Sequence, residues 1–253
     1  MNIALETLDR VRVLRFARPE RRNAITAAMY AALADALEQA ADDAAVRVVV
    51  VTGSENAFTA GNDLSDFLNE PPTKEDAPVF RFLRAIASFP KPLVASVCGP
   101  AVGVGTTMLL HCDLVYAGEN AMLSLPFVHL GLCPEAASSL LLPAAVGYQR
   151  AAEKLLLGEA FGAAEAKEIG LVNRVLPPAE VEGFALEQAA KLASRPITSL
   201  LATKALMKSG LGDAVRERMV EEGRYFARML GEPAAREAFS AFLEKRPADF
   251  SRV

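Results

Sequence analysis

The sequence is poor in cysteine and contains no tryptophan. Its three cysteines, Cys98, Cys112 and Cys133, are odd in number, and none belongs to a C-x-x-C pair. This pattern argues against a disulfide framework and against a zinc site, and is typical of small thiols in a reducing compartment. We therefore expect no metal centre.

Long apolar runs are also missing. No stretch approaches the roughly 20 uncharged apolar residues of a membrane-spanning helix. Residues 1–6 lack the basic and apolar regions of a secretory signal. These absences predict a cytoplasmic protein with no membrane partner.

Basic residues are not in excess. The 27 lysines and arginines stand against 31 acidic residues, which gives a formal net charge of −4. A protein that binds nucleic acid independently of its sequence usually carries the opposite charge, gathered in a patch. We therefore expect no nucleic-acid partner.

What remains is the composition of an ordinary globular protein, with 52% hydrophobic and 23% charged residues. A chain of 253 residues fits one large domain or a main domain with an appendage. Strand patterns alternate with helix patterns up to about residue 176, and helix patterns alone follow. We predict an α/β core over residues 1–194 and a helical region over residues 195–253.

The clearest local patterns lie near the start of the chain. Residues 3–16 alternate as in a hairpin that turns at Asp9, and a helix is predicted to begin after Thr26 as its N-cap. Buried strands are expected at 46–51, 93–97, 114–117, 122–125 and 171–175. Helices are expected at 77–89, 105–111, 136–145, 150–157, 163–169, 180–194, 197–209, 213–230 and 233–245.

Two segments combine small residues with a position after a buried strand. The first, residues 58–64, reads FTAGNDL, and its small residues allow backbone to approach a ligand while Asp63 bonds the turn. The alternative interpretation is an ordinary tight loop between a strand and a helix.

The second segment is the glycine-rich turn at residues 99–105, which leads from a strand into a helix. Unpaired N–H groups at a helix start attract negative charge. The run from Gly103 resembles the opening of a dinucleotide fingerprint, but Met108 replaces its third glycine, and Leu123 and Ser124 stand where the ribose-binding acid belongs. A dinucleotide site is therefore not expected.

Together these segments resemble the crotonase, or enoyl-CoA hydratase/isomerase, superfamily. The matching pieces occur in order at 18–25, 58–64, 91–105, 112–114, 158–160, 166–172 and 239–246. The resemblance implies a spiral of β-β-α units with a C-terminal helical region that forms trimers or dimers of trimers. It also implies an acyl-CoA substrate and no cofactor, since coenzyme A is part of the substrate.

The resemblance further implies an oxyanion hole made of two backbone N–H groups, those of Asn62 and Val104. Fixed donors of this kind stabilise the negative charge that develops on a thioester oxygen. By position, contacts to the acyl-CoA are expected from Arg22, Ala24, Ala60, Gly61, Asp63, Leu64, Pro126, Phe127 and Lys245.

The positions of the carboxylates indicate the reaction. The two glutamates that the family's hydratases use fall at Thr107 and Phe127 in this sequence. Neither side chain can act as an acid or base, which argues against hydration as the main activity.

Glu135 is a carboxylate elsewhere in the same region, within the run CPEAASS. Here the chain resembles the 3,2-enoyl-CoA isomerase branch, whose single catalytic glutamate occupies this place. One carboxylate can move a proton from C2 to C4 of a 3-enoyl-CoA, as in fatty-acid or related degradation. From the residues alone, Glu135 could instead be an exposed glutamate in the first turn of a helix, where it favours the helix dipole.

Other functions stay open at this point. One alternative is a hydratase or a thioester hydrolase of the same superfamily, using Glu135 or Asp66. Another is a catalytically silent protein that binds acyl-CoA. His111 is predicted to be a hydrogen-bonded core histidine, and His129 with Cys133 lacks the third group that a thiol nucleophile needs.

Overall fold

The computed structural model describes residues 2–69 and 76–253. Its main sheet has six strands in the order β1-β2-β3-β4-β6-β9. The hairpin predicted at the start of the chain is confirmed, because β1 (Ile3–Leu8) and β2 (Val11–Phe16) pair antiparallel. The remaining strands pair parallel: β3 (Val48–Thr52), β4 (Leu93–Val97), β6 (Leu114–Gly118) and β9 (Arg174–Leu176).

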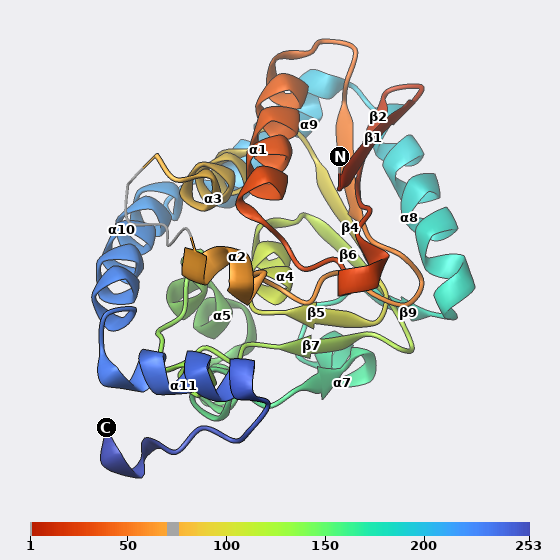
Figure 1. The fold of residues 1–253 in the computed structure, drawn as a ribbon. Coiled ribbons are helices and arrows are strands. Elements are labelled where there is room, and N and C mark those ends of the chain that lie inside the picture. Colours follow the sequence, from red (N-terminus) through yellow and green to blue (C-terminus); the bar gives the residue numbers. More distant parts are fainter. Residues whose placement is uncertain (1, 70–75) are drawn as a thin grey trace.

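A second, smaller sheet joins β5 (Pro100–Val102), β7 (Met122–Ser124) and β8 (Phe161–Gly162). Figure 1 shows β5 and β7 running across the direction of β4 and β6. Two strands of the main sheet are followed by a short strand and then a helical segment: β4 by β5 and α4 (Val104–Thr107), and β6 by β7 and η3 (Val128–Leu130). The chain therefore winds as a spiral of β-β-α units, as expected.

Helices cover both faces of the main sheet. On one face, α8 (Pro178–Ala193) packs Val181, Ala185 and Ala189 on the valines of β2, β3 and β4. On the other face lies α1 (Ala27–Asp42), which Thr26 caps by accepting a hydrogen bond from the N–H of Met29. Because both faces are covered, β3 and β4 are buried along their whole length.

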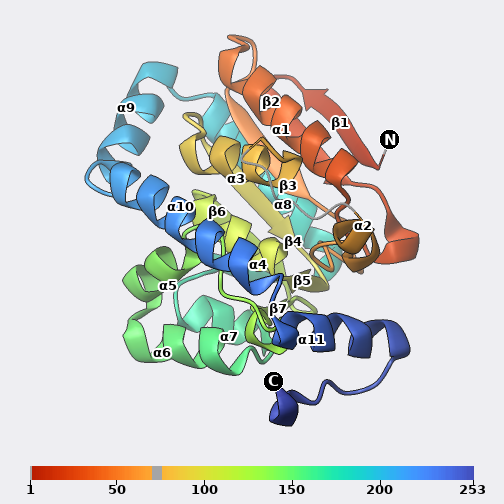
Figure 2. The ribbon, with the colours of Figure 1, turned by 60° about the vertical axis from the view of Figure 1, so that its left-hand side comes forward.

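The C-terminal helices do not form a body apart from the core. Figure 2 shows α10 (Gly212–Met229) lying between α3 (Pro78–Ser88) and α5 (Ser138–Val146). Phe226 of α10 and Phe239 of α11 (Pro233–Glu244) belong to the main hydrophobic cluster. The region predicted to start at residue 195 therefore contributes to the core that surrounds the site.

Some elements differ from their predictions. The helix expected through His111 is α4 followed by a 3-10 turn at Met108–His111, and the strand expected at 171–175 is found at Arg174–Leu176. The strand β5 and the helix α2 (Leu64–Asn69) were not predicted, since both are too short to show a periodic pattern. The remaining elements are η1 (Pro19–Arg21), α6 (Tyr148–Ala152), η4 (Glu153–Leu157), α7 (Ala163–Glu168), α9 (Ile197–Lys208) and η5 (Phe250–Arg252).

No helix in the described part of the chain combines the length and the apolar character that crossing a bilayer requires.

Candidate active site

The two segments singled out in the sequence lie against each other. The N–H of Thr59 donates to the carbonyl of Pro100 at 2.9 Å, and the N–H of Val102 donates to the carbonyl of Thr59 at 3.0 Å. Gly61 has φ +84°, and a Cβ there would lie 2.7 Å from the carbonyl oxygen of Val102. Only glycine fits this approach, so the two loops are held together by backbone.

Asn62 and Val104 follow these contacts, and both line one cavity. Among the described residues, neither backbone N–H donates a hydrogen bond. The side-chain oxygen of Asn62 is occupied, because it accepts a hydrogen bond from the hydroxyl of Tyr30. The N–H groups at these two positions are therefore available to a ligand oxygen, while the Asn62 side chain serves the protein.

Asp63 closes the first loop from inside. Its Oδ1 accepts from the N–H groups of Ser65 at 3.1 Å and Asp66 at 3.2 Å, and its Oδ2 accepts from Arg18 at 2.6 Å. Partial burial raises the pKa of Asp63, but the hydrogen bonds from Arg18 and Asp66 outweigh it and lower the pKa. The role predicted for Asp63 in bonding the turn is thus confirmed.

Asp66, the alternative candidate for the catalytic acid, also forms a hydrogen bond within the protein. Its Oδ2 accepts a hydrogen bond from the N–H of Ala27 at 2.7 Å, which caps the start of α1. Asp66 does not line the cavity. A catalytic role for Asp66 therefore has no support in this geometry.

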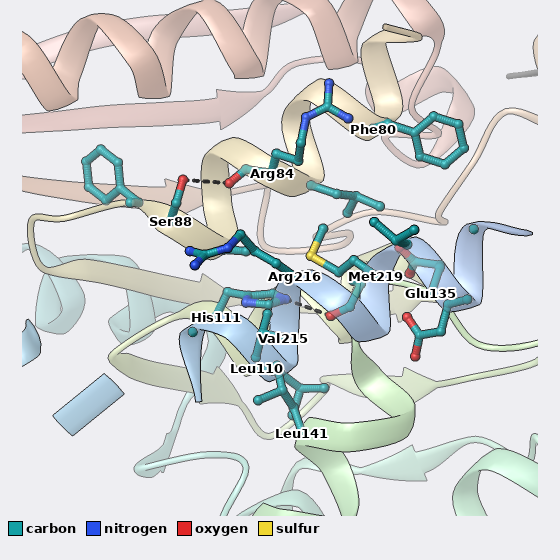
Figure 3. Close-up of a pocket in the computed structure, with 18 of the residues that line it drawn as sticks. Phe80, Arg84, Ser88, Leu110, His111, Glu135, Leu141, Val215, Arg216 and Met219 are labelled. Atoms are coloured by element: carbon teal, nitrogen blue, oxygen red, sulfur yellow. Dashed lines mark hydrogen bonds between the residues drawn. The ribbon is translucent and has the colours of Figure 1, made fainter. Parts of the chain in front are cut away.

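The cavity has a volume of about 1400 Å³. Side chains of α3 and α10 supply much of its apolar wall, including Leu83, Val215 and Met219. Figure 3 shows Glu135 beside α10 and Met219, while Arg84 and Ser88 lie along α3. The cavity therefore extends from Glu135 between α3 and α10, and it is wide enough for an acyl chain.

The two carboxyl oxygens of Glu135 differ in their hydrogen bonding. Its Oε1 accepts a hydrogen bond from the hydroxyl of Thr107 at 2.5 Å. Its Oε2 is enclosed and has no partner among the described residues. Buried polar atoms almost always have a partner, and an exception such as this one needs an explanation, of which a catalytic role is one.

The backbone around Glu135 is not helical. Ala136 and Ala137 have φ of +60° and +55°, and α5 begins only at Ser138. The interpretation of Glu135 as an exposed first-turn glutamate is therefore wrong. Two successive alanines in the left-handed region instead turn the chain so that the carboxyl group faces the cavity.

Burial dominates the acidity of Glu135. Enclosure of the carboxyl group raises its pKa to about 8, the hydrogen bond from Thr107 opposes the rise, and the charge of Glu222 adds to it. The residue as a whole is half-buried, but its Oε2 is fully enclosed. The raised pKa follows from this enclosure of the carboxyl group. A carboxylate with this pKa is a much stronger base than an exposed one.

Two neighbours of this site were missed in the sequence. Tyr30 lies on the buried stripe of α1, is 3% exposed, and burial and the charge of Glu135 raise the pKa of its hydroxyl. Glu222 lies on α10 and is 5% exposed. In the sequence, a tyrosine within the apolar stripe of a helix is a weak indication that Tyr30 lies at a site. Glu222 stands in a charged helical segment, which gives no such indication.

The two positions that carry acids in hydratases are both buried. Thr107 lies in α4 with no exposed surface, and Phe127 is 6% exposed in the main hydrophobic cluster. The carboxylates of the described cavity lining are Asp76, Glu135 and Glu222, and Glu222 is hydrogen-bonded through both oxygens.

The remaining residues predicted to contact acyl-CoA do not line this cavity, namely Arg22, Ala24, Ala60, Gly61, Asp63, Leu64, Pro126, Phe127 and Lys245. Arg22 and Lys245 are exposed, and both have positive φ, of 49° and 55°. Ala24 and Ala60 are joined to the Arg22 loop by backbone bonds, from Ala24 to Arg21 and from Ala60 to Arg22. Leu64 begins α2, and the Cα of Pro126 lies near Gly158.

His111 and Cys133 behave as ordinary structural groups. His111 is 3% exposed and its Nε2 lies 2.8 Å from the carbonyl oxygen of Ala136, which confirms the prediction of a hydrogen-bonded core histidine. Burial lowers its pKa to about 4. Burial also raises the pKa of Cys133 to about 11, so this thiol is not a ready nucleophile. The described residues contain no cluster of ligands suited to a metal ion.

Comparison with known proteins agrees with this geometry. Residues 6–252 match the family model described as enoyl-CoA hydratase/isomerase. The 2,3-dehydroadipyl-CoA hydratase of Escherichia coli is 36% identical over 247 residues, covering 96% of this chain and 95% of that protein. Enoyl-CoA delta isomerase 2 of Rattus norvegicus is 37% identical over 239 residues, covering 92% of this chain and 61% of that protein.

Solved structures share the fold. The structure of Pseudomonas aeruginosa OdaA is similar with a TM-score of 0.94 and 46% identity, covering 96% of this chain and 98% of the other. The β-β-α spiral expected from the sequence is thereby confirmed. The chain belongs to the enoyl-CoA hydratase/isomerase family of the crotonase superfamily, whose members act on acyl-CoA esters.

Proposed function

We propose that the protein is an isomerase that converts a 3-enoyl-CoA into the conjugated 2-enoyl-CoA. The observation that carries this proposal is the carboxyl group of Glu135, enclosed in the cavity with one oxygen unpartnered among the described residues. Relatives of similar identity include both a hydratase and a delta isomerase, so the choice between these reactions rests on the carboxylates of the site.

In the proposed reaction, Glu135 takes a proton from C2 of the substrate. The electrons move into a dienolate whose oxygen is held by the N–H groups of Asn62 and Val104. One such donor contributes roughly 3–4 kcal/mol to transition-state stabilisation. The protonated Glu135 then returns the proton to C4, so that a single carboxyl group acts first as base and then as acid.

Hydration needs a second acid–base group, and the described residues carry none at the two positions where the family's hydratases have one. Water must be activated by one acid–base residue while another delivers a proton, and each is worth about 10²–10⁴-fold. Thr107 and Phe127 cannot supply these functions. Thr107 instead donates to Oε1 of Glu135, so the position of one hydratase acid supports the single carboxylate here.

Two parallel assays test the proposal. We expect the protein to consume 3-hexenoyl-CoA, with the absorbance of the conjugated product appearing, and to leave 2-hexenoyl-CoA without hydration. Glu135→Gln is the matched control, because it keeps the shape and the acceptor for Thr107 but removes the base. Hydration of 2-hexenoyl-CoA with no isomerisation would overturn the proposal in favour of a hydratase. Tight acyl-CoA binding with no turnover of either would indicate a silent binding protein.

We also propose that the 195–253 region mediates a homotrimer or a dimer of trimers. The support is a set of exposed apolar side chains on its helices, Leu206, Met207, Phe242 and Leu243. They lie in pairs on α9 and α11, and an interface between copies of the chain would cover such exposed apolar surface. Light scattering on the purified protein tests this, and a monomeric mass would contradict it.

The acyl-CoA contacts predicted outside the cavity belong to the same proposal. Arg22 and Lys245 would meet the nucleotide part of coenzyme A from the first loop and the end of α11. We place the activity in fatty-acid or related acyl-CoA degradation in the cytoplasm, with no cofactor besides the coenzyme A of the substrate. A rise in KM with unchanged kcat in Lys245→Ala is expected, and an unchanged KM would remove that residue from the site.

A further inference from the structure

The turn that carries Glu135 has a conformation that its own residues do not favour. Ala136 and Ala137 both lie in the left-handed region, with φ of +60° and +55°. A Cβ makes this region unfavourable, and two such residues in succession require support from their surroundings. Ala137 is also the N-cap of α5, and an alanine has no side-chain oxygen to accept a hydrogen bond from the first turn.

Glu222 of α10 supplies what this turn lacks. Its Oε2 accepts from the N–H of Ala137 at 2.6 Å. Its Oε1 accepts from the N–H of Ser139 at 3.0 Å and from the Ser139 hydroxyl at 2.6 Å. Both oxygens are thus used by the turn, and a side chain from a distant helix takes the place of a local cap.

The surroundings of Glu222 show that this arrangement is built around it. The residue is 5% exposed, and an enclosed carboxylate is costly unless hydrogen bonds and charges compensate it. Burial raises the pKa of Glu222, and the hydrogen bonds from Ser139 and Ala137 together with the charge of Arg218 oppose this rise. Arg218, one turn earlier on α10, also donates to the Ser139 hydroxyl at 3.1 Å. The other titratable groups that face it are Glu135 and Cys133.

We propose that Glu222 is a positioning residue for Glu135: it fixes the left-handed turn at Ala136 and Ala137 and so aims the carboxyl group of Glu135 into the cavity. This inference rests on the proposed function in taking Glu135 as the catalytic acid–base residue. Glu222 itself is engaged through both oxygens and does not act on the substrate.

The proposed positioning has two separable effects. The hydrogen bonds hold the turn, so their loss lets Glu135 leave its place in the cavity that Asn62 and Val104 also line. The negative charge of Glu222 also raises the pKa of Glu135, so its loss makes Glu135 a weaker base that ionises at lower pH. A residue that served the fold alone would change neither the turnover of folded protein nor its pH dependence.

Hydrogen exchange tests the first effect without any assay of activity. In Glu222→Ala, the amides of Ala137 and Ser139 lose their acceptor, and we expect their exchange to accelerate at least tenfold. In Glu222→Gln, the amide oxygen can still accept from the N–H of Ala137, while the NH₂ group takes the place of Oε1 and cannot accept from the N–H of Ser139. We therefore expect the exchange of the Ser139 amide alone to accelerate.

Kinetics test the second effect. We expect kcat on 3-hexenoyl-CoA to fall at least tenfold in Glu222→Ala with KM changed less than twofold. We expect a smaller fall in Glu222→Gln, with the acidic limb of its pH–kcat/KM profile moved to lower pH. Glu182→Gln is the matched control. Glu182 lies on α8, on the other face of the sheet, where it pairs with Arg15. We expect this variant to change neither kcat nor the pH profile.

The outcomes separate this proposal from the proposed function. Unchanged exchange at Ala137 and Ser139 in Glu222→Ala, or unchanged kcat and pH profile in folded Glu222→Gln, would overturn the positioning role. If the wild-type protein does not isomerise 3-hexenoyl-CoA, the proposed function fails. The exchange result then still decides whether Glu222 holds the turn.

Discussion

The two sides of the candidate site are built by different means. On the donor side, Asn62 and Val104 offer backbone N–H groups, and the loops that carry them are joined by backbone hydrogen bonds and a glycine contact. On the acid side, the carboxyl group of Glu135 accepts a hydrogen bond from the side chain of Thr107, and the side chain of Glu222 bonds the turn that follows Glu135. The donor side should therefore tolerate most side-chain changes, whereas the acid side should respond to single substitutions.

The largest expected effect is on the acid side. Glu135→Gln keeps the acceptor for Thr107 but removes the base, and we expect kcat to fall by about 10³–10⁴-fold with little change in acyl-CoA binding. Isomerisation of 3-hexenoyl-CoA and calorimetric titration with a saturated acyl-CoA measure the two quantities. Turnover near the wild-type rate would remove Glu135 from the mechanism.

On the donor side, only a change that moves the backbone should have a comparable effect. Gly61→Ala places a Cβ 2.7 Å from the carbonyl oxygen of Val102 at φ +84°. We expect the loops to shift, with a loss of about 10²-fold in kcat and roughly 1–3 kcal/mol in the free energy of unfolding. Gly183→Ala is the control, because nothing lies within 4 Å of its Cβ. Wild-type kcat in a stable Gly61→Ala protein would contradict a backbone-built oxyanion hole.

The acidity of Glu135 gives a prediction of intermediate size. Because its pKa is about 8 and the base must be ionised, kcat/KM should rise about tenfold per pH unit below 8 and level off above it. Thr107→Val removes the hydrogen bond that lowers this pKa, so the acidic limb should move to higher pH. A pH profile of both proteins measures the shift, and a shift to lower pH would be inconsistent with this geometry.

The same pKa predicts how stability depends on pH. The pKa of Glu135 is raised from 4.5 to about 8 in the folded protein, so its stabilising contribution is present below pH 4.5 and is lost as the pH rises toward 8. The loss is at most about 1.4 kcal/mol per pH unit. Glu135→Gln does not titrate, and we expect its Tm advantage over the wild type to grow between pH 5 and pH 8. A constant Tm difference would show that the carboxyl group is not enclosed in solution.

The smallest expected effect comes from changing the side chain of Asn62. Asn62→Ala keeps the backbone N–H and removes only the acceptor for the Tyr30 hydroxyl. We expect kcat within a few-fold of the wild type and a loss of about 1–3 kcal/mol in stability, because a buried hydroxyl loses its partner. A loss of activity as large as that of Gly61→Ala would mean that the side chain, not the backbone, acts on the substrate.

The same contrast explains which parts of the site could be predicted from the sequence. The loops of Asn62 and Val104 are marked by glycines after buried strands, and the motif around Glu135 indicates a candidate acid–base residue. Glu222 could not be found, because its contact with Ala137 spans 85 residues and its own segment reads as an ordinary charged helix. The left-handed turn was also hidden, since alanine gives no sign of positive φ. The hairpin and the stripe of α1 were predictable because each is governed by a local period.

The contact between Ala137 and Glu222 has a consequence for how the protein becomes active during synthesis. A ribosome releases the chain from its N-terminus, so the donor loops and Glu135 emerge well before α10 does. Until α10 docks between α3 and α5, the turn at Ala136 and Ala137 has no acceptor for its N–H groups. We therefore expect a nascent or truncated chain ending before α10 to carry all of its proposed reactive groups and yet remain inactive.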